Sequence, residues 1–239
     1  MLIDLHTHTS GISICCKADI PRVINEAKAV GLDGIVLTNH YCREYIGDTA
    51  LDEYVQRYLA EYRAAVLAAK EELRVYFGIE VTLARHDDLH FLIYGAGEDF
   101  LMRHPSVFDY SLSKLYSLVK EEGAMLVQAH PYRKKKRLMD ISLMDGIEIS
   151  CHPKYEGTHL RELAEIAAEG GKILTCGGDY HADTPYRPRC GVYLPDELTD
   201  AKEIAAYLLD AQSVRMAVQE TDGSAPFAVT FARGIGLCE

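Results

Sequence analysis

Short apolar runs recur along this chain, and each is bounded by a side chain that can bind a metal ion. The runs and their bounding residues are 2–5 with His6 and His8, 34–38 with His40, 75–79 with Glu80, 91–94 with His90, 124–129 with His130, and 173–178 with Asp179 and His181. Apolar runs of this length are typical of buried strands. Because ligands at strand ends can converge on one face of a barrel, we expect these side chains to meet there.

Helix-like segments separate these runs along most of the chain. The predicted helices span residues 18–30, 51–73, 111–122, 160–169 and 200–211. Strands that alternate with helices predict parallel strands with the helices packed outside them. We find no linker, repeat or low-complexity segment, so we expect one α/β domain over residues 1–239. Within it, residues 195–239 are expected to supply a helix and then a late strand, at 214–218, or a tail.

The second of these helices carries a stripe of large side chains. Its members recur at four-residue spacing and are Tyr54, Tyr58, Tyr62 and Val66. Side chains at this spacing lie on one face of a helix. We therefore expect the stripe to pack into the core rather than to bind a ligand.

The composition excludes some partners. The 239 residues are 48% hydrophobic and 26% charged, as in an ordinary globular protein, and their net charge is -11. An acidic chain repels phosphate-rich partners on average, which argues against broad binding of nucleic acid or anionic membranes. No apolar stretch approaches the ~18–20 residues of a membrane span, and the start lacks a signal-peptide pattern. Seven cysteines without framework spacing favour reduced thiols in a cytoplasm.

The polar residues at the run ends have the spacing of metal ligands. His6 and His8 are two apart, so on an extended strand both imidazoles point the same way. Asp179 and His181 repeat that spacing at the end of a late run. Imidazoles with a few carboxylates suit zinc, iron or manganese. We therefore expect two or three divalent ions, with Glu80 and Asp179 as the candidate bridging carboxylates.

Five segments resemble the motifs of a known family, in its order along the chain. They are residues 4–10, 37–40, 78–80, 128–131 and 178–181. They are similar to the motifs of the PHP family, named for polymerase and histidinol phosphatase. The resemblance implies an α/β fold of TIM-like type, a distorted (β/α)7 barrel, with a site for two or three metal ions. For many stand-alone members it also implies phosphoesterase activity.

The resemblance also implies how the ligands divide among the ions. The first ion would use His6, His8, Glu80 and Asp179; the second His40 and His181; the third Glu80, His90 and His130. His86 and Asp88 are alternatives to His90. The family usually places a further His or Asp in the loop after the first two histidines.

That loop here, residues 10–19, departs from the family pattern, and the ligand it would supply to the second ion stays open. It offers Cys15, Cys16 or Asp19. Asp19 fits equally well as a carboxylate in the first turn of the following helix. The two cysteines also fit as ordinary reduced loop thiols.

A reaction follows from clustered divalent ions, which lower the pKa of a bridging water and stabilise charge on a phosphoryl group. We expect a phosphate monoester of a small molecule to be cleaved by a metal-bridging hydroxide, with Glu80, Asp179 and His181 as catalytic residues. Arg133, in the basic stretch after His130, is a candidate for a bidentate phosphate contact, although a solvated loop is an equal reading. Arg187 is a second candidate.

Other residues and functions stay open. Glu148 ends a further apolar run and could support the ligands from behind. Tyr41 and Tyr132 follow ligand histidines and fit either substrate binding or packing. His104, His152 and His159 lack a motif and are expected in loops or at the surface. The alternative functions are a phosphodiesterase or nuclease, another metallohydrolase, or a non-catalytic metal-binding domain, and the sequence gives no substrate identity or oligomeric state.

Overall fold

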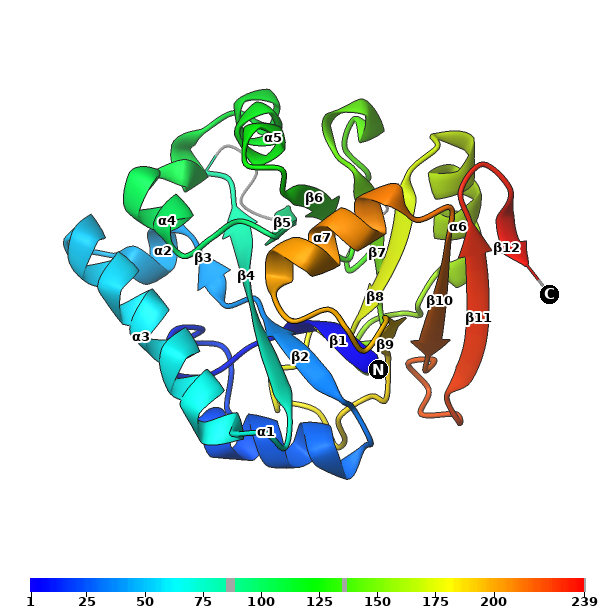
Figure 1. Ribbon diagram of the computed structural model, residues 1–239, viewed down its shortest axis with the longest axis horizontal. Coiled ribbons are helices and arrows are strands. Elements are labelled where there is room, and N and C mark those ends of the chain that lie inside the picture. Colours follow the sequence, from blue (N-terminus) through cyan, green and yellow to red (C-terminus); the bar gives the residue numbers. More distant parts are fainter. Residues whose placement is uncertain (85–88, 135–136, 239) are drawn as a thin grey trace.

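The computed structural model describes residues 1–84, 89–134 and 137–238, and Figure 1 shows a curled sheet with helices packed around it. The strands are β1 Leu2–Thr7, β2 Gly34–Leu37, β3 His40–Tyr41, β4 Arg74–Thr82, β5 His90–Tyr94, β6 Met125–Gln128, β7 Gly146–Ser150, β8 Ile173–Gly177, β9 Gly191–Tyr193, β10 Ser213–Val218, β11 Phe227–Ala232 and β12 Gly236–Cys238. The helices are α1 Ile20–Ala29, α2 Arg43–Ile46, α3 Leu51–Ala69, α4 Asp99–Arg103, α5 Leu112–Glu121, α6 Leu160–Glu169 and α7 Ala201–Asp210, with short 3-10 turns at Val107–Asp109 and Ile141–Leu143.

The strands of the described residues form one mixed sheet. Its order is β12-β11-β10-β9-β1-β2-β4-β5-β6-β7-β8, and β3 pairs beside β4. β1, β2 and β4 run parallel, as do β6, β7 and β8. β5 runs antiparallel to both of its neighbours, and β9 to β12 are joined by antiparallel pairs. The fold is therefore mixed α/β with a curled half-barrel sheet, and a regular (β/α)7 barrel is not confirmed.

The reversal of β5 explains how a residue that opens a strand reaches the same site as residues that close strands. In the antiparallel pair, His90 lies opposite Thr82, and Leu92 lies opposite Glu80. The start of β5 therefore lies beside the end of β4. The end of β1 also meets the segment that follows β8, because Thr7 forms a single parallel bridge with Tyr180.

The predicted helices are confirmed, with ends that differ by a few residues. The largest difference is in α3, which ends at Ala69 because Lys70 adopts a left-handed conformation (φ 51°) and β4 begins at Arg74. Tyr54 and Tyr58 are buried against the core as expected, and Tyr62 is partly buried against it. The expectation is wrong for Val66, which is 41% exposed because α3 is long enough for its face to rotate away from the sheet.

The C-terminal part completes the sheet rather than ending in a tail. α7 packs against β4, β5 and β6 and crosses the front of the sheet in Figure 1. The late strand predicted at residues 214–218 is β10, and β11 and β12 extend the sheet beyond it. Gly191 makes the join to β1 possible, because a Cβ there would lie 2.1 Å from the carbonyl oxygen of Ile3. No helix among the described residues combines the length and apolarity that crossing a membrane requires.

Candidate metal centre

All eight predicted ligands lie at one end of the curled sheet. His6 belongs to β1 and His8 follows it; His40 begins β3; Glu80 lies near the end of β4; His90 begins β5; His130 follows β6; and Asp179 and His181 follow β8. Each is at most 9% exposed. Because these strand ends lie at one end of the sheet, side chains up to 175 positions apart in the chain meet there.

Four of these side chains form a compact set of ligand atoms. His6 Nε2 lies 3.3 Å from Asp179 Oδ1 and 3.4 Å from Glu80 Oε1. His8 Nε2 lies 3.2 Å from Asp179 Oδ1 and 3.3 Å from Glu80 Oε2. In a tetrahedral zinc site with bonds of ~2.0–2.1 Å, neighbouring ligand atoms are ~3.3 Å apart. The spacing around His6, Glu80 and Asp179 suits the first ion expected from the sequence. His130 completes this group, whereas His8 groups with His40 and His181.

The same atoms lack hydrogen-bond partners. His6 Nε2, His8 Nε2, Glu80 Oε2 and Asp179 Oδ1 are all buried without one. Unpaired buried polar atoms are costly, and a cation between four such atoms would compensate them. The residues present therefore fit a bound divalent ion.

Glu80 is the carboxylate that joins the ligand groups. Its Oε1 lies 2.7 Å from His90 Nδ1 and 3.1 Å from His130 Nε2, and its Oε2 lies 2.6 Å from His40 Nδ1. Burial alone would raise the pKa of Glu80, but the surrounding histidines, His40 first, hold it well below its usual range. Histidines, led by His6, have the same effect on the pKa of Asp179 against its burial. Both carboxylates are therefore ionised and able to bridge ions.

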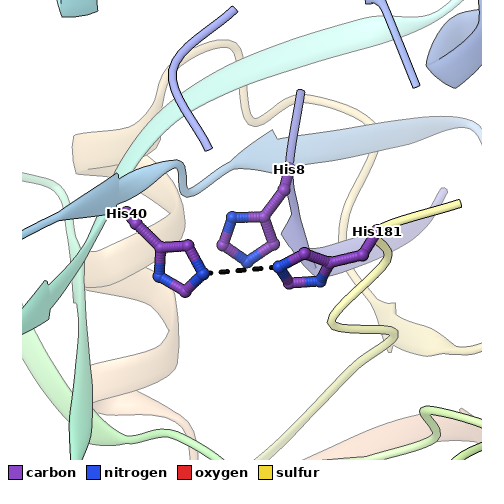
Figure 2. Close-up of side chains that lie close together, drawn as sticks. All are labelled: His8, His40 and His181. Atoms are coloured by element: carbon purple, nitrogen blue, oxygen red, sulfur yellow. Dashed lines mark hydrogen bonds between the residues drawn. The ribbon is translucent and has the colours of Figure 1, made fainter. Parts of the chain in front are cut away.

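His8, His40 and His181 form a second group, in which the ring nitrogens point toward one another (Figure 2). The rings of His8 and His181 are 4.1 Å apart, and His40 Nε2 lies 3.3 Å from His181 Nε2. Burial, with the neighbouring His181 and His40, lowers the pKa of His8 well below its ordinary value. Against the effect of burial, Glu80 raises the pKa of His40 to about 10, and Asp179 raises the pKa of His181. A metal ion would displace these protons, since imidazole binds metals in its neutral form.

Hydrogen bonds behind the ligands fix which nitrogen faces inward. His6 Nδ1 lies 2.9 and 3.0 Å from the two Glu148 oxygens, and one of these oxygens also accepts from the backbone N–H of His130 (3.1 Å). Ser13 Oγ contacts His8 Nδ1 at 3.0 Å. Such contacts orient the Nε2 atoms toward a metal. Burial raises the pKa of Glu148 to about 7, against the opposing effect of His6.

The turns that carry two ligands are held in conformations unusual for residues other than glycine. His130 has φ 26° and Asp179 has φ 45°. Left-handed backbone at such residues is sparsely populated and occurs often at functional sites. The strand-to-loop turns are therefore shaped by the position of the ligands.

An open pocket of about 900 Å³ lies above the centre. Arg133 lines it and lies 3.4 Å from His90 Nε2, and within the described residues it has no carboxylate partner. Arg43 also lines the pocket but pairs with Asp109 at 2.6 Å. Among the described residues, Arg133 is thus the pocket arginine without a carboxylate partner.

Two residues of the pocket were missed by the motifs. His152 was expected in a loop or at the surface, yet it is buried, lines the pocket and stacks on Tyr155 with 4.5 Å between ring centres. The Tyr155 hydroxyl donates to Asp179 Oδ2, so Asp179 Oδ1 is the oxygen that faces the ligand set. Both residues lie in the segment after β7. Their position after a predicted strand is therefore the sequence feature that could have identified them.

Other candidates take different positions. Arg187 does not line the pocket; its buried guanidinium donates to Asp4 Oδ2 (2.8 Å) and Thr7 Oγ1 (2.9 Å), which corrects its expected place beside substrate. Tyr41 is a packing residue whose hydroxyl donates to the Pro105 carbonyl.

The remaining candidates do not take part in the pocket that the structure describes. Tyr132 packs at the core margin, and His104 and His159 do not line this pocket. His86 and Asp88 fall outside the described residues.

Comparisons with known proteins agree with this geometry. The chain superposes on a two-domain protein containing a predicted PHP-like metal-dependent phosphoesterase from Bacteroides vulgatus ATCC 8482, with a TM-score of 0.64 and 18% identity over 92% of this chain and 65% of that one. It therefore spans about two-thirds of that protein's length. A protein from Bifidobacterium adolescentis ATCC 15703, described as a candidate metal-dependent phosphoesterase, gives 0.51 at 18% identity over 84% of this chain and 93% of that one.

A third structure, PsfC from Pseudomonas syringae PB-5123, gives a TM-score of 0.57 at 14% identity over 96% of this chain and 90% of that one. At these identities the likenesses establish a shared fold. Among curated proteins, none matches this sequence. The PHP domain family matches residues 4–213, which is most of the chain. The strand-end ligands, the fold and this match together show that the chain belongs to the PHP domain family.

Proposed function

We propose that this protein is a metal-dependent hydrolase that cleaves phosphate monoesters of small molecules. One observation carries the proposal: buried, unpartnered nitrogen and carboxylate atoms, those of Asp179 among them, lie beside a pocket lined by Asp179 and by Arg133, which has no carboxylate partner among the described residues. Bound divalent ions at such a floor supply Lewis acidity and an activated water. The PHP-like phosphoesterases among its structural relatives support this reaction class.

The residues of the chain divide the work between holding ions and holding substrate. His6, His8, Glu80 and Asp179 would hold the first ion, and a second would lie at His40 and His181. The third ion expected from the sequence would use Glu80, His90 and His130. Glu80 is central to all of them, because both of its oxygens contact histidines of different groups.

The contacts of each histidine determine which of its ring nitrogens is available to bind an ion. His181 Nδ1 lies 2.8 Å from the carbonyl oxygen of Asp179, so this nitrogen carries the proton and Nε2 faces the pocket as a free ligand. His40 Nδ1 lies 2.6 Å from Glu80 Oε2, which leaves Nε2 as the nitrogen that faces His181. Of the proposed catalytic residues, Glu80 and Asp179 would present ionised carboxylates, and His181 in its neutral form would present Nε2.

Arg133 is the proposed phosphate-binding residue. A guanidinium presents several N–H donors in one plane, which matches the oxygens of a phosphate. Its location between His90 and Tyr155 places it beside the ligand set. Carboxylates at a distance, with Tyr155, raise the pKa of Arg133 although burial opposes this, so the side chain stays cationic. A pocket of about 900 Å³ accommodates a small organic phosphate.

A metal-loaded substrate screen tests the proposal. Protein loaded with manganese, zinc or iron should release phosphate from p-nitrophenyl phosphate and from some members of a panel of sugar, nucleoside and amino-alcohol phosphates. Asp179→Asn should abolish turnover. Arg133→Met should raise KM about tenfold or more, whereas Arg43→Met, an arginine of the same pocket neutralised by Asp109, should change KM little.

The same screen separates the alternatives. Turnover of bis-p-nitrophenyl phosphate or of oligonucleotides without monoester cleavage would replace the proposal by a phosphodiesterase. Turnover only of amides or carboxyl esters would replace it by another metallohydrolase. Metal-loaded protein that turns over nothing in the panel would contradict an enzymatic role.

A further inference from the structure

We propose that Cys151, Cys176 and Cys190 form a separate metal site, which binds a soft, thiophilic cation of the copper(I) or zinc class. The site shares no residue with the centre of histidines and carboxylates, and it does not depend on the proposed phosphatase reaction. The three sulfur atoms lie within 4.8 Å of one another, and Cys151 Sγ lies 3.6 Å from Cys176 Sγ. Within the described residues, the group contains thiols alone.

The spacing of the sulfur atoms suits direct coordination. With metal–sulfur bonds of ~2.3 Å, the sulfur atoms around a tetrahedral ion are ~3.8 Å apart. The 3.6 Å between Cys151 and Cys176 is close to this value. Small movements of the side chains would therefore be enough to admit an ion.

The three cysteines come from segments that the order of hydrogen-bonded strands places far apart. Cys176 lies in β8, at one end of that order, and the N–H of Cys151, just after β7, donates to the Gly177 carbonyl (2.9 Å). Cys190 directly precedes β9, which pairs with β1 and β10. Figure 1 shows β8 close to β9 and β10, although it has no ladder with them. An ion held by the three sulfur atoms would join the two sides of the half-barrel at this seam.

Burial and sulfur chemistry together select the ion. All three side chains are 0% exposed, so water does not reach the group from the surface. Thiolate ligands favour copper(I), zinc and related ions over magnesium or manganese, which prefer oxygen. Copper(I) is satisfied by three sulfur ligands. Zinc takes a fourth ligand, for which the Ala217 carbonyl oxygen, 3.4 Å from Cys176 Sγ, is the candidate.

A cation would also balance the charge of the group. Against the effect of burial, hydrogen bonds from Cys176 and Cys190 lower the pKa of Cys151, which favours a first thiolate there. Burial raises the pKa of Cys190 well above its ordinary value. Binding would release the remaining thiol protons to the solvent, and the bound cation would offset the thiolates in the interior.

Metal loading with a readout specific to thiolates tests this site. The reduced chain is refolded from urea with excess manganese, which does not favour thiolates, and with one equivalent of copper(I) or of cadmium(II) as a zinc analogue. We expect a thiolate-to-metal charge-transfer band in the ultraviolet. At about 100 times its Kd, the ion should also raise the Tm by about 5–10 °C. A band with copper(I) alone would assign a monovalent ion, and a band with cadmium(II) would support the zinc class.

Two variants remove ligands from opposite sides of the seam. Cys176→Ala and Cys190→Ala should each abolish the band and the gain in Tm. Cys16→Ala is the matched control, because Cys16 is a buried thiol outside the group. Cys15→Ser removes a thiol that lines the pocket beside the other centre. Both controls should keep the band and the gain in Tm.

Reduced wild-type protein that shows neither the band nor the gain in Tm with either ion would overturn the inference, whether or not the variants fold. So would a band that survives both Cys176→Ala and Cys190→Ala, because the ligands would then be other thiols. Phosphate release by the manganese-loaded protein tests the proposed function separately. Each of the two proposals can therefore fail while the other stands.

Discussion

Replacing Arg187 should destabilise the fold, although the residue lies outside the pocket. Its side chain is 1% exposed and that of Asp4 is fully buried, with 2.8 Å between Arg187 Nη2 and Asp4 Oδ2. Asp4 Oδ1 in turn accepts from the backbone N–H of His6 (3.1 Å) and of Gly178 (2.8 Å). This buried pair therefore connects the two strand ends that carry His6 and Asp179.

The expected loss of stability depends on the hydrogen-bond donors that Asp4 keeps. Removal of one partner of a buried ion pair typically costs about 3–5 kcal/mol, because the other charge is left uncompensated. Asp4 would retain its two backbone donors and the Thr7 hydroxyl, which favours the lower end, about 3 kcal/mol. Loss of the cation over the Tyr180 ring, 4.4 Å away, adds about 1 kcal/mol. For Arg187→Met we expect a loss of about 4 kcal/mol.

Urea unfolding in the presence of a chelator measures this value without a contribution from bound ions. Arg189→Met is the control, since Arg189 is a half-buried arginine of the same loop with no ion pair among the described residues. The double variant Asp4→Asn with Arg187→Met should recover part of the loss, because no unpaired charge is then buried. A loss below about 1 kcal/mol for Arg187→Met, or one equal to that of Arg189→Met, would refute the reasoning.

Three further predictions concern the metal centre and the sheet. Zinc or manganese at about 100 times its Kd should stabilise the wild-type protein by about 2.7 kcal/mol in thermal unfolding, and Asp179→Asn should remove most of that gain. An unchanged Tm would contradict ion binding at this site. Glu148→Gln should lower metal affinity about 10- to 100-fold in a chelator competition, because His6 loses its anionic partner. Glu156→Gln, at an exposed position in the loop after β7, should not. Gly191→Ala should lower the free energy of unfolding by about 3 kcal/mol or more, since its Cβ would meet Ile3. Gly123→Ala, also at positive φ but in open space, should lower it by about 1 kcal/mol. Equal losses would show that the contact with Ile3 is unimportant.

The sequence was sufficient to predict that the proposed ligands lie together, because their positions follow from one geometric rule. A His or carboxylate at the end of a buried run reaches the same edge of the sheet as its counterparts on other strands. The rule holds for His6, His40 and Asp179, and for His90 as well, since an antiparallel strand brings its start to that edge. The direction of β5 itself could not be predicted, because an apolar run reads the same for a parallel and an antiparallel strand.

Contacts between distant loops were harder to predict. Arg187 was expected beside substrate because it follows His181 closely, but a charged side chain can turn either way from a loop, and here Asp4 attracts it inward. Tyr155 was missed for the related reason that its role depends on a partner 24 positions away, Asp179. Which of two adjacent thiols faces the pocket likewise depends on loop hydrogen bonds that no spacing rule contains.

The meeting of Thr7 with Tyr180 has a consequence for the order in which the molecule is made. His6 and His8 are synthesised before Asp179 and His181, which follow more than 170 positions later. A nascent chain therefore carries the proposed ligands His6 and His8 without Asp179 and His181 until those later positions have been made. Closing so long a loop is slow, since its entropy must be overcome before the contacts form. Ion capture should accordingly require synthesis past His181, and a truncation before residue 179 should abolish it.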